Sequence, residues 1–299
     1  MSDTPEKIDT NAALEKIASS LEKLQSHMSR ADRDDVQCDF GEYTAFLWQP
    51  ENSRLRPVPK VQRIPLNLLH GIEQVRETLL ENTIRFAKGL PANNALLWGA
   101  RGTGKSSIVK AIHNHVTNLP GKMDSKLILV EIQRDDIASV DRLLEALRDQ
   151  KERVLLYCDD LSFDQDDATY KSLKAILDGG VLGRPENILF YATSNRRHLM
   201  PRDMIENEQA TGVHPGEAIE EKLSLSDRFG LWLGFHRCDQ NTYLKMVHAY
   251  CDYFGLDKAE DLEFRAKQWS TTRGSRSGRV AWQFIQDLAG EQGKSLKFE

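Results

Sequence analysis

Nine consecutive residues, GARGTGKSS from Gly99 to Ser107, have the types and spacing needed to bind phosphate. They fit the pattern G-x-x-x-x-G-K-[S/T], in which glycines let successive backbone N–H groups turn toward an anion. In this pattern the lysine, Lys105, reaches the β- and γ-phosphates, and the hydroxyl of Ser106 ligates Mg²⁺. The sequence therefore predicts a site for a nucleoside triphosphate with Mg²⁺. Its members are Gly99, Ala100, Arg101, Gly102, Thr103, Gly104, Lys105, Ser106 and Ser107.

Two adjacent acids follow an apolar run, RVLLYCDD at 153–160. A buried strand that ends here brings both carboxylates to the surface where Mg²⁺ and the γ-phosphate are expected. We assign Asp159 to the metal, through water, and Asp160 to the attacking water as its general base or orienting group.

Three more polar side chains are candidates for contact with the γ-phosphate. Asn195 ends the apolar run NILFYATSN, and its amide can donate to the water or to the phosphate, although a turn-forming role is the alternative. Arg228 in SDRFG and Arg279 in SGRVA carry the planar, permanently charged guanidinium that stabilises a phosphate in a transition state. For Arg228 the alternative is an ion pair with Asp227 or another neighbouring acid, and Arg276 is the second choice beside Arg279.

The base of the nucleotide is expected near the segment His70-Gly71-Ile72. Gly71 and Ile72 are the candidate contacts to an adenine ring. No [N/T]-K-x-D motif, which reads guanine, follows the phosphate-binding segment, so we predict adenine.

The elements that must position these residues are apolar runs that alternate with helical patterns. Five such runs are expected as strands, and strands that alternate with helices predict an α/β fold with a parallel sheet and right-handed crossovers. Ligands of such sheets bind beyond the carboxyl ends of the strands, where the polar residues above are expected. The runs are NNALLW at 93–98, KLILVEI at 126–132, RVLLYCDD at 153–160, NILFYATSN at 187–195 and LWLGFHR at 231–237.

The chain divides into four predicted parts. Residues 1–35 form an amphipathic helix that either docks on its own core or binds a partner, and residues 36–65 are a proline-containing connector. Residues 66–237 form the nucleotide-binding core, which begins with one helix from 66 to 88. Residues 238–299 form a small lid of three helices.

Composition sets the class of protein. The 299 residues, 28% charged and 40% hydrophobic, suit one globular core with a small appendage. The four cysteines form no C-x-x-C pair, which argues against a disulfide framework or a zinc site and favours the reducing cytoplasm. Neither a secretion signal nor a run of about 18 apolar residues is present, so we expect neither export nor a membrane span.

The charge pattern gives little support for nucleic acid. The formal net charge of -5 provides no global attraction for phosphate chains, although 265–279 is basic and contains no acid. We favour a solvated surface for this stretch, with one or two arginines directed at the nucleotide's own phosphates.

The order of the motifs GARGTGKS, LLYCDD, YATSN, SDRFG and SGRVA resembles that of the AAA+ ATPases, as Walker A, Walker B, sensor 1, arginine finger and sensor 2. The resemblance covers about 66–290. It is closest to a bacterial family of predicted AAA+ ATPases of unknown function, through CDDLSF, ATSNRRHL and EEKLSLSDRFG. It implies a five-stranded αβα core with a helical lid, ATP and Mg²⁺ as cofactors, and ring-like homo-oligomers in which Arg228 serves the neighbour's site.

The chain departs from this resemblance in one motif, because many AAA+ proteins end Walker B with Asp-Glu and this chain has Asp159-Asp160. The shorter second acid suggests slow hydrolysis or a switch-like cycle. The leading hypothesis is an ATP hydrolase that remodels or loads a protein or nucleic-acid client as an oligomer. Alternatives are a nucleotide-gated scaffold with little hydrolysis and a P-loop phosphotransferase.

Overall fold

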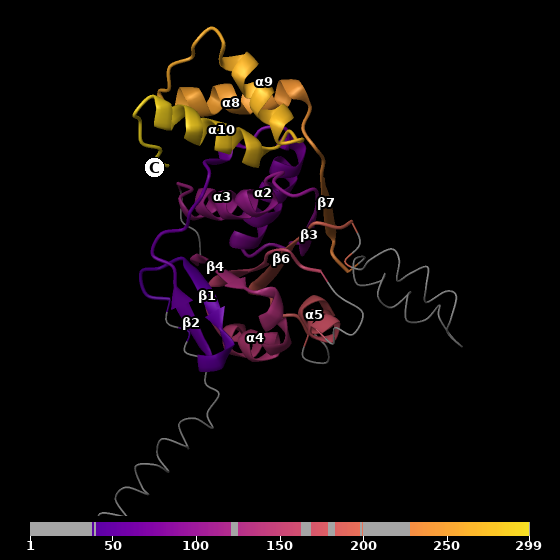
Figure 1. Cartoon of the computed structure of the whole chain (residues 1–299). Helices are drawn as coiled ribbons and strands as arrows, with labels where there is room; N and C mark the ends of the chain where they lie inside the picture. The colour runs from indigo at the N-terminus through magenta and orange to yellow at the C-terminus, as the bar shows by residue number, and fades with distance from the viewer. Residues whose placement is uncertain are drawn as a thin grey trace, which may run out of the picture. The chain divides into compact units, whose positions relative to one another are not determined.

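The computed structural model describes residues 38, 40–120, 125–162, 169–178, 183–197, 199 and 228–298. The chain separates into two compact units, Met1–Val36 and Gln37–Glu299. The predicted N-terminal helix lies outside the described residues, and all that follows concerns the second unit (Figure 1).

The described residues form one seven-stranded sheet in the order β2-β1-β4-β5-β6-β3-β7. The five predicted strands are all present and run parallel to their neighbours in the sheet. Their bounds, with those of the two further strands, are β1 (Ala45–Gln49), β2 (Arg54–Pro57), β3 (Ala95–Gly99), β4 (Leu127–Ile132), β5 (Arg153–Cys158), β6 (Ile188–Ser194) and β7 (Leu231–Phe235). The α/β prediction is confirmed.

The predicted number of five strands is wrong, because the region predicted as a connector adds a hairpin to the sheet. β1 pairs parallel with β4, and β2 pairs antiparallel with β1. The prolines that favoured a connector are compatible with this hairpin. Pro50 lies in the turn between the strands, and Pro57 is the last residue of an edge strand, where a missing N–H is harmless.

The central strands are buried on both faces. β6 is buried along its whole length and β5 from its second residue onward, so both are continuous apolar runs of the kind found in covered parallel sheets. Figure 1 shows α2 (Glu73–Ala87) and α3 (Lys105–Thr117) on one face of the sheet, with α4 (Val140–Arg148) and α5 (Thr169–Asp178) on the other. This three-layer core fixes the carboxyl ends of β3, β5 and β6 beside one another.

The helix expected from 66 to 88 is shorter than predicted. Leu66–Leu68 form a 3-10 turn, and α2 begins only at Glu73. Between them Gly71 has a φ of 80°, and a Cβ there would lie 2.5 Å from Cγ2 of Thr242 in the lid. The helix is interrupted so that the lid can approach the chain closely at Gly71.

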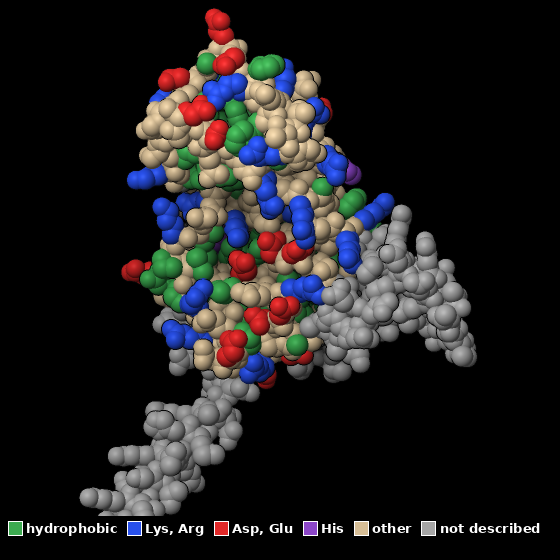
Figure 2. All heavy atoms as spheres, in the orientation of Figure 1, with side chains coloured by type: hydrophobic (Ala, Val, Ile, Leu, Met, Phe, Trp, Pro, Cys, Tyr) green, Lys and Arg blue, Asp and Glu red, His purple; other side chains and the backbone are tan. Residues whose placement is uncertain are grey.

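The lid has three helices, α8 (Gln240–Phe254), α9 (Leu262–Thr272) and α10 (Gly278–Glu291), as predicted. Asp239 caps α8 by accepting a 2.7 Å hydrogen bond from the backbone N–H of Thr242. Figure 2 shows charged side chains gathered across the waist between the lid and the sheet. None of the helices in the described part of the chain is long and apolar enough to cross a membrane.

Candidate nucleotide site

The segment between β3 and α3 folds as a loop that only glycine permits at two key positions. Gly99 has a φ of 143°, and a Cβ there would lie 2.0 Å from the backbone oxygen of Phe235 on β7. Gly102 has a φ of 77°, and a Cβ there would lie 3.1 Å from Cβ of Arg279. The loop therefore follows a course closed to other side chains, which is what the phosphate-binding motif requires of its glycines.

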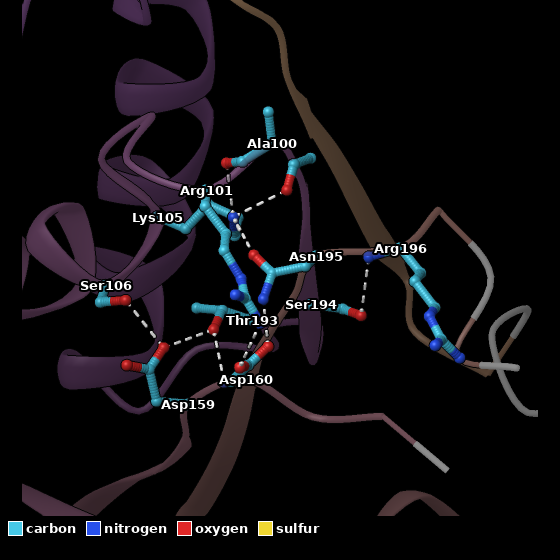
Figure 3. Close-up of polar contacts among 11 residues, drawn as sticks. Ala100, Arg101, Lys105, Ser106, Asp159, Asp160, Thr193, Ser194, Asn195 and Arg196 are labelled. Carbon is cyan, nitrogen blue, oxygen red and sulfur yellow. Dashed lines mark hydrogen bonds and ion pairs between the residues drawn. The ribbon is translucent and has the colours of Figure 1, made fainter. Parts of the chain in front are cut away.

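Lys105 lies at the base of this loop with its side chain buried. Its Nζ donates to the backbone oxygens of Gly99 and Ala100, both at 2.8 Å, and to Oδ1 of Asn195 at 3.1 Å (Figure 3). These contacts hold the ammonium group between the phosphate loop and the end of β6. Lys105 and Asn195, which the sequence predicts to lie near the same phosphate, are thus in direct contact in the structure.

Two opposing effects act on the pKa of Lys105. Burial lowers the pKa of its ammonium group, while the carboxylates of Asp159 and Asp160 act in the other direction. The lysine pKa remains below its usual range. An arriving phosphate, like these carboxylates, favours the charged form.

Asp159 follows β5 and is held in its ionised form. Its Oδ1 accepts hydrogen bonds from Oγ of Ser106 at 2.7 Å and from Oγ1 of Thr193 at 2.5 Å. Burial raises the pKa of this carboxyl, but the hydrogen bonds outweigh burial and bring the pKa below its ordinary value. Ser106 and Asp159 therefore present adjacent oxygens, as expected of two groups on the same Mg²⁺ site.

Asp160 points in a different direction because its backbone is left-handed, with a φ of 53°. Its exposed carboxylate accepts a hydrogen bond from Nδ2 of Asn195, and its Oδ2 lies 3.9 Å from Nη2 of Arg101. Its backbone N–H donates to Oγ1 of Thr193 at 2.9 Å. The two adjacent acids thus face different partners, one toward Ser106 and the other toward Asn195.

Thr193 is a polar residue of this site that the sequence interpretation missed. A single hydroxyl donates to Asp159 and accepts from the backbone of Asp160, so Thr193 ties β6 to both acids. The pairing of Cys158 with Ala192 places Thr193 beside Asp159. The polar run TSN at the end of an apolar strand was the available signal, and only the register selects the threonine from it.

The lid meets the phosphate loop at the N-terminus of α10. The backbone N–H of Arg279 donates to the oxygen of Gly102 at 3.3 Å. Ser277 caps the same helix by accepting a 3.3 Å bond from the backbone N–H of Val280. Arg279, but not Arg276, lines the cavity described next.

A cavity of about 710 Å³ brings most of these groups together. One end is polar and lined by Arg101 to Ser107, Asp159, Asp160, Thr193, Asn195 and Arg279; the other is mainly apolar and lined by Ile64, Leu68, Leu69, His70, Ile72, Met246, Tyr250 and Trp282. Of the two predicted base contacts, Ile72 lines this cavity and Gly71 lines a separate hollow.

The apolar end contains an unsatisfied buried polar atom. Within the described residues, Nε2 of His70 has no hydrogen-bond partner. Burial first, and then the charge of Lys245, lower the pKa of this imidazole, so the ring is neutral. A neutral ring beside apolar side chains suits a purine, and the polar part of the lining suits a triphosphate with Mg²⁺. The residues present therefore fit this cofactor.

Arg228 does not reach the cavity of its own chain. It precedes β7, whereas Gly99 of the phosphate loop pairs with Phe235 at the other end of that strand. Its Nε lies 2.8 Å from Oδ2 of Asp178, so the chain contains the ion pair with a neighbouring acid that was the alternative interpretation. Its role in a neighbouring subunit stays a prediction.

The mostly parallel sheet, with a phosphate loop after β3 and a three-helix lid, has the fold of solved AAA+ structures. The fold is similar to that of a RuvB mutant from Thermotoga maritima, with a TM-score of 0.51 and 15% identity over 78% of this chain and 69% of that one. For ORC1 of Aeropyrum pernix, in complex with DNA, the TM-score is 0.54 and the identity is 12%, over 77% of this chain and 65% of that one. For the FIGL-1 AAA domain, in complex with ADP, the TM-score is 0.50 and the identity is 17%, over 77% of this chain and 75% of that one.

The chain belongs to the family described as "Protein of unknown function (DUF815)", whose profile matches residues 41–292. The expected resemblance to AAA+ proteins of unknown function is confirmed. No curated protein matches the sequence.

Proposed function

We propose that this protein binds ATP with Mg²⁺ and hydrolyses it. The observation that carries the proposal is the convergence of Lys105, Ser106, Asp159, Asp160 and Asn195 on one cavity that also has an apolar end. A fold alone does not define an activity, so the argument depends on this set of residues.

Each residue has a role that follows from its contacts. Backbone N–H groups of the loop and Nζ of Lys105 bind the phosphates, while His70 and Ile72 bind the base. Ser106 and Asp159 would hold Mg²⁺, which when bound neutralises phosphate oxygens and orients them. Asp160 and Asn195, hydrogen-bonded to each other, face the same polar end of the cavity.

Asp160 is assigned as the group that accepts the proton of the attacking water. Its carboxylate is exposed and takes up the proton of the attacking water, while the amide of Asn195 orients that water or the γ-phosphate. Arg279 adds positive charge from the lid, and its backbone contact with Gly102 links the lid to the phosphates.

Motion of the lid is the proposed output of the cycle. Because α10 contacts the phosphate loop directly, the position of the lid depends on what the loop binds. We propose that a cytoplasmic, ring-like homo-oligomer uses this motion to remodel or load a macromolecular client, with Arg228 acting at the neighbour's site. The complex of the similar ORC1 with DNA makes nucleic acid one class of client to test.

The test is steady-state phosphate release by the purified protein. We expect Mg²⁺-dependent turnover that falls at least about 100-fold in Lys105→Ala, because the lysine lies between the loop and Asn195. Equal rates in the two proteins, with both folded, would remove the hydrolase proposal.

A second candidate, a nucleotide-gated scaffold, is favoured by one observation. The short side chain of Asp160 is held by Asn195 and lies near Arg101, which limits its reach toward a water. Assembly that depends on ATP, with turnover no faster than in Lys105→Ala, would support the scaffold instead.

A further inference from the structure

A second cavity, of about 590 Å³, borders the nucleotide site. Four parts of the chain bound it: residues 60–64 after β2, the first turns of α3, one side of α10, and residues 296–298 near the C-terminus, which Figure 1 shows beside α10. The two cavities share part of their lining, namely Ile64, Ser106, Ser107 and Trp282. Whatever fills the second cavity therefore contacts the turn of α3 that carries the predicted magnesium ligand.

The described lining of this cavity carries a net positive charge. It includes Lys60, Arg63, Lys110 and Lys297, and none of the described lining residues is an aspartate or a glutamate. Lys110 lies 3.7 Å from Glu131, which is outside the lining. The other three cations take part in no ion pair within the described part of the chain. These three cations around one small hollow repel one another, and an anion relieves that repulsion.

Two aromatic side chains form one wall of the same cavity. The rings of Trp282 and Phe298 are stacked, with centroids 5.0 Å apart and an interplanar angle of 29°. The amides of Gln62 and Gln286 add hydrogen-bonding groups to the lining. A planar ring packs on such a wall, its edge bonds to amides, and attached phosphates pair with the cations.

We propose that this second cavity is a binding site for a small phosphorylated ligand with a planar ring, of the nucleoside monophosphate class, distinct from the ATP site. The volume lies within the range of small-molecule pockets, and the four chain segments around it define a compartment for one small molecule. Through Ser106 and Ser107 the ligand acts on α3, so the site is an effector site for the nucleotide cycle.

The experiment uses the full chain with its ATP site saturated by Mg²⁺ and the non-hydrolysable analogue AMP-PNP. AMP, GMP and inorganic pyrophosphate are titrated separately in a calorimeter. We expect at least one monophosphate to bind once per chain, and at least about ten-fold more tightly than pyrophosphate because of the ring contact.

Matched variants assign the binding to this cavity. Arg63→Gln combined with Lys297→Gln should weaken monophosphate binding at least about ten-fold, since both cations line the cavity. Lys294→Gln removes a nearby cation that pairs with Asp257 outside the cavity, and it should leave binding unchanged. AMP-PNP affinity should be the same in all proteins, which shows that each is folded.

Four results would overturn the proposal: no heat with either monophosphate, unchanged affinity in the double variant, loss of monophosphate binding when AMP-PNP saturates the chain, or binding of a short single-stranded DNA at these residues in place of monophosphates. If AMP-PNP itself does not bind, the proposed hydrolase function fails, and titration without the analogue still tests this cavity.

Discussion

At the scale of single residues, Asp160, the second of the two acids after β5, has a backbone conformation that suits aspartate. Asp160 has a φ of 53°, a region that glycine, asparagine and aspartate enter more readily than other residues. The sequence shows aspartate where many AAA+ proteins have the longer glutamate. This aspartate fits the left-handed backbone at position 160. The turn directs the carboxylate toward Asn195 and Arg101.

This geometry predicts that a longer acid at this position does not improve the enzyme. Asp160→Glu should reduce stability by about 1 kcal/mol, because glutamate is strained at positive φ, and turnover should not rise. Thermal unfolding and phosphate release measure the two effects. Asp160→Asn, which tolerates the same backbone, is the control and should keep ATP binding while losing turnover. A faster, equally stable glutamate variant would contradict the argument.

The hydroxyl of Thr193 leads to a prediction about how turnover depends on pH. Thr193→Val removes a hydrogen bond that lowers the pKa of Asp159, so that pKa rises and the carboxylate protonates at a higher pH than in the wild type. The acid limb of the turnover profile should move to higher pH, and turnover at neutral pH should fall by about ten-fold. Thr193→Ser keeps the hydroxyl and should restore both. A valine variant with lower turnover but the same pH profile would assign Thr193 a purely structural role.

At the scale of elements, the N-terminus of α10 serves both the fold and the site. Ser277 caps the helix, and the next turn contacts Gly102 through the backbone of Arg279. Ser277→Ala should cost about 1 kcal/mol of stability and also weaken nucleotide binding, because the frayed turn is the one that meets the loop. Asp239→Ala removes the comparable cap of α8, which lines the cavity only beyond its first turn, and should lower stability with a smaller change in nucleotide affinity than Ser277→Ala. Equal nucleotide affinity in both variants, measured by calorimetry, would argue against this coupling.

The elements also show why some features were predictable and others were not. β5 and β6 are apolar runs in the sequence because they are buried on both faces, and the phosphate loop is a local pattern. The break before α2 was not predictable, since the need for Gly71 arises from its contact with Thr242, far along the chain. The β1–β2 hairpin was hidden by prolines that lie in its turn and at its edge, and Thr193 by the register of β6 on β5.

At the scale of the whole molecule, the position of Arg228 separates it from every other predicted site residue. The strand from Leu231 to Phe235 spans roughly 13 Å, and Arg228 precedes its first residue while the phosphate loop adjoins its last. Because Arg228 is remote from its own cavity, any catalytic role requires a second subunit. A head-to-tail ring supplies one, since each copy then presents the same surface to the next.

Mixing two inactive variants tests this arrangement directly. Arg228→Ala keeps a complete nucleotide site but offers no arginine to its neighbour, and Lys105→Ala has the reverse defect. In a randomly mixed ring at equal amounts, about a quarter of the interfaces join an intact site to an intact arginine, so activity should return to about a quarter of the wild type. Asp178→Asn controls for loss of the ion pair with Arg228 and should retain turnover. If the mixed proteins assemble, as shown by their size, and still release no phosphate, catalysis is not shared between subunits and the arginine-finger role of Arg228 is ruled out.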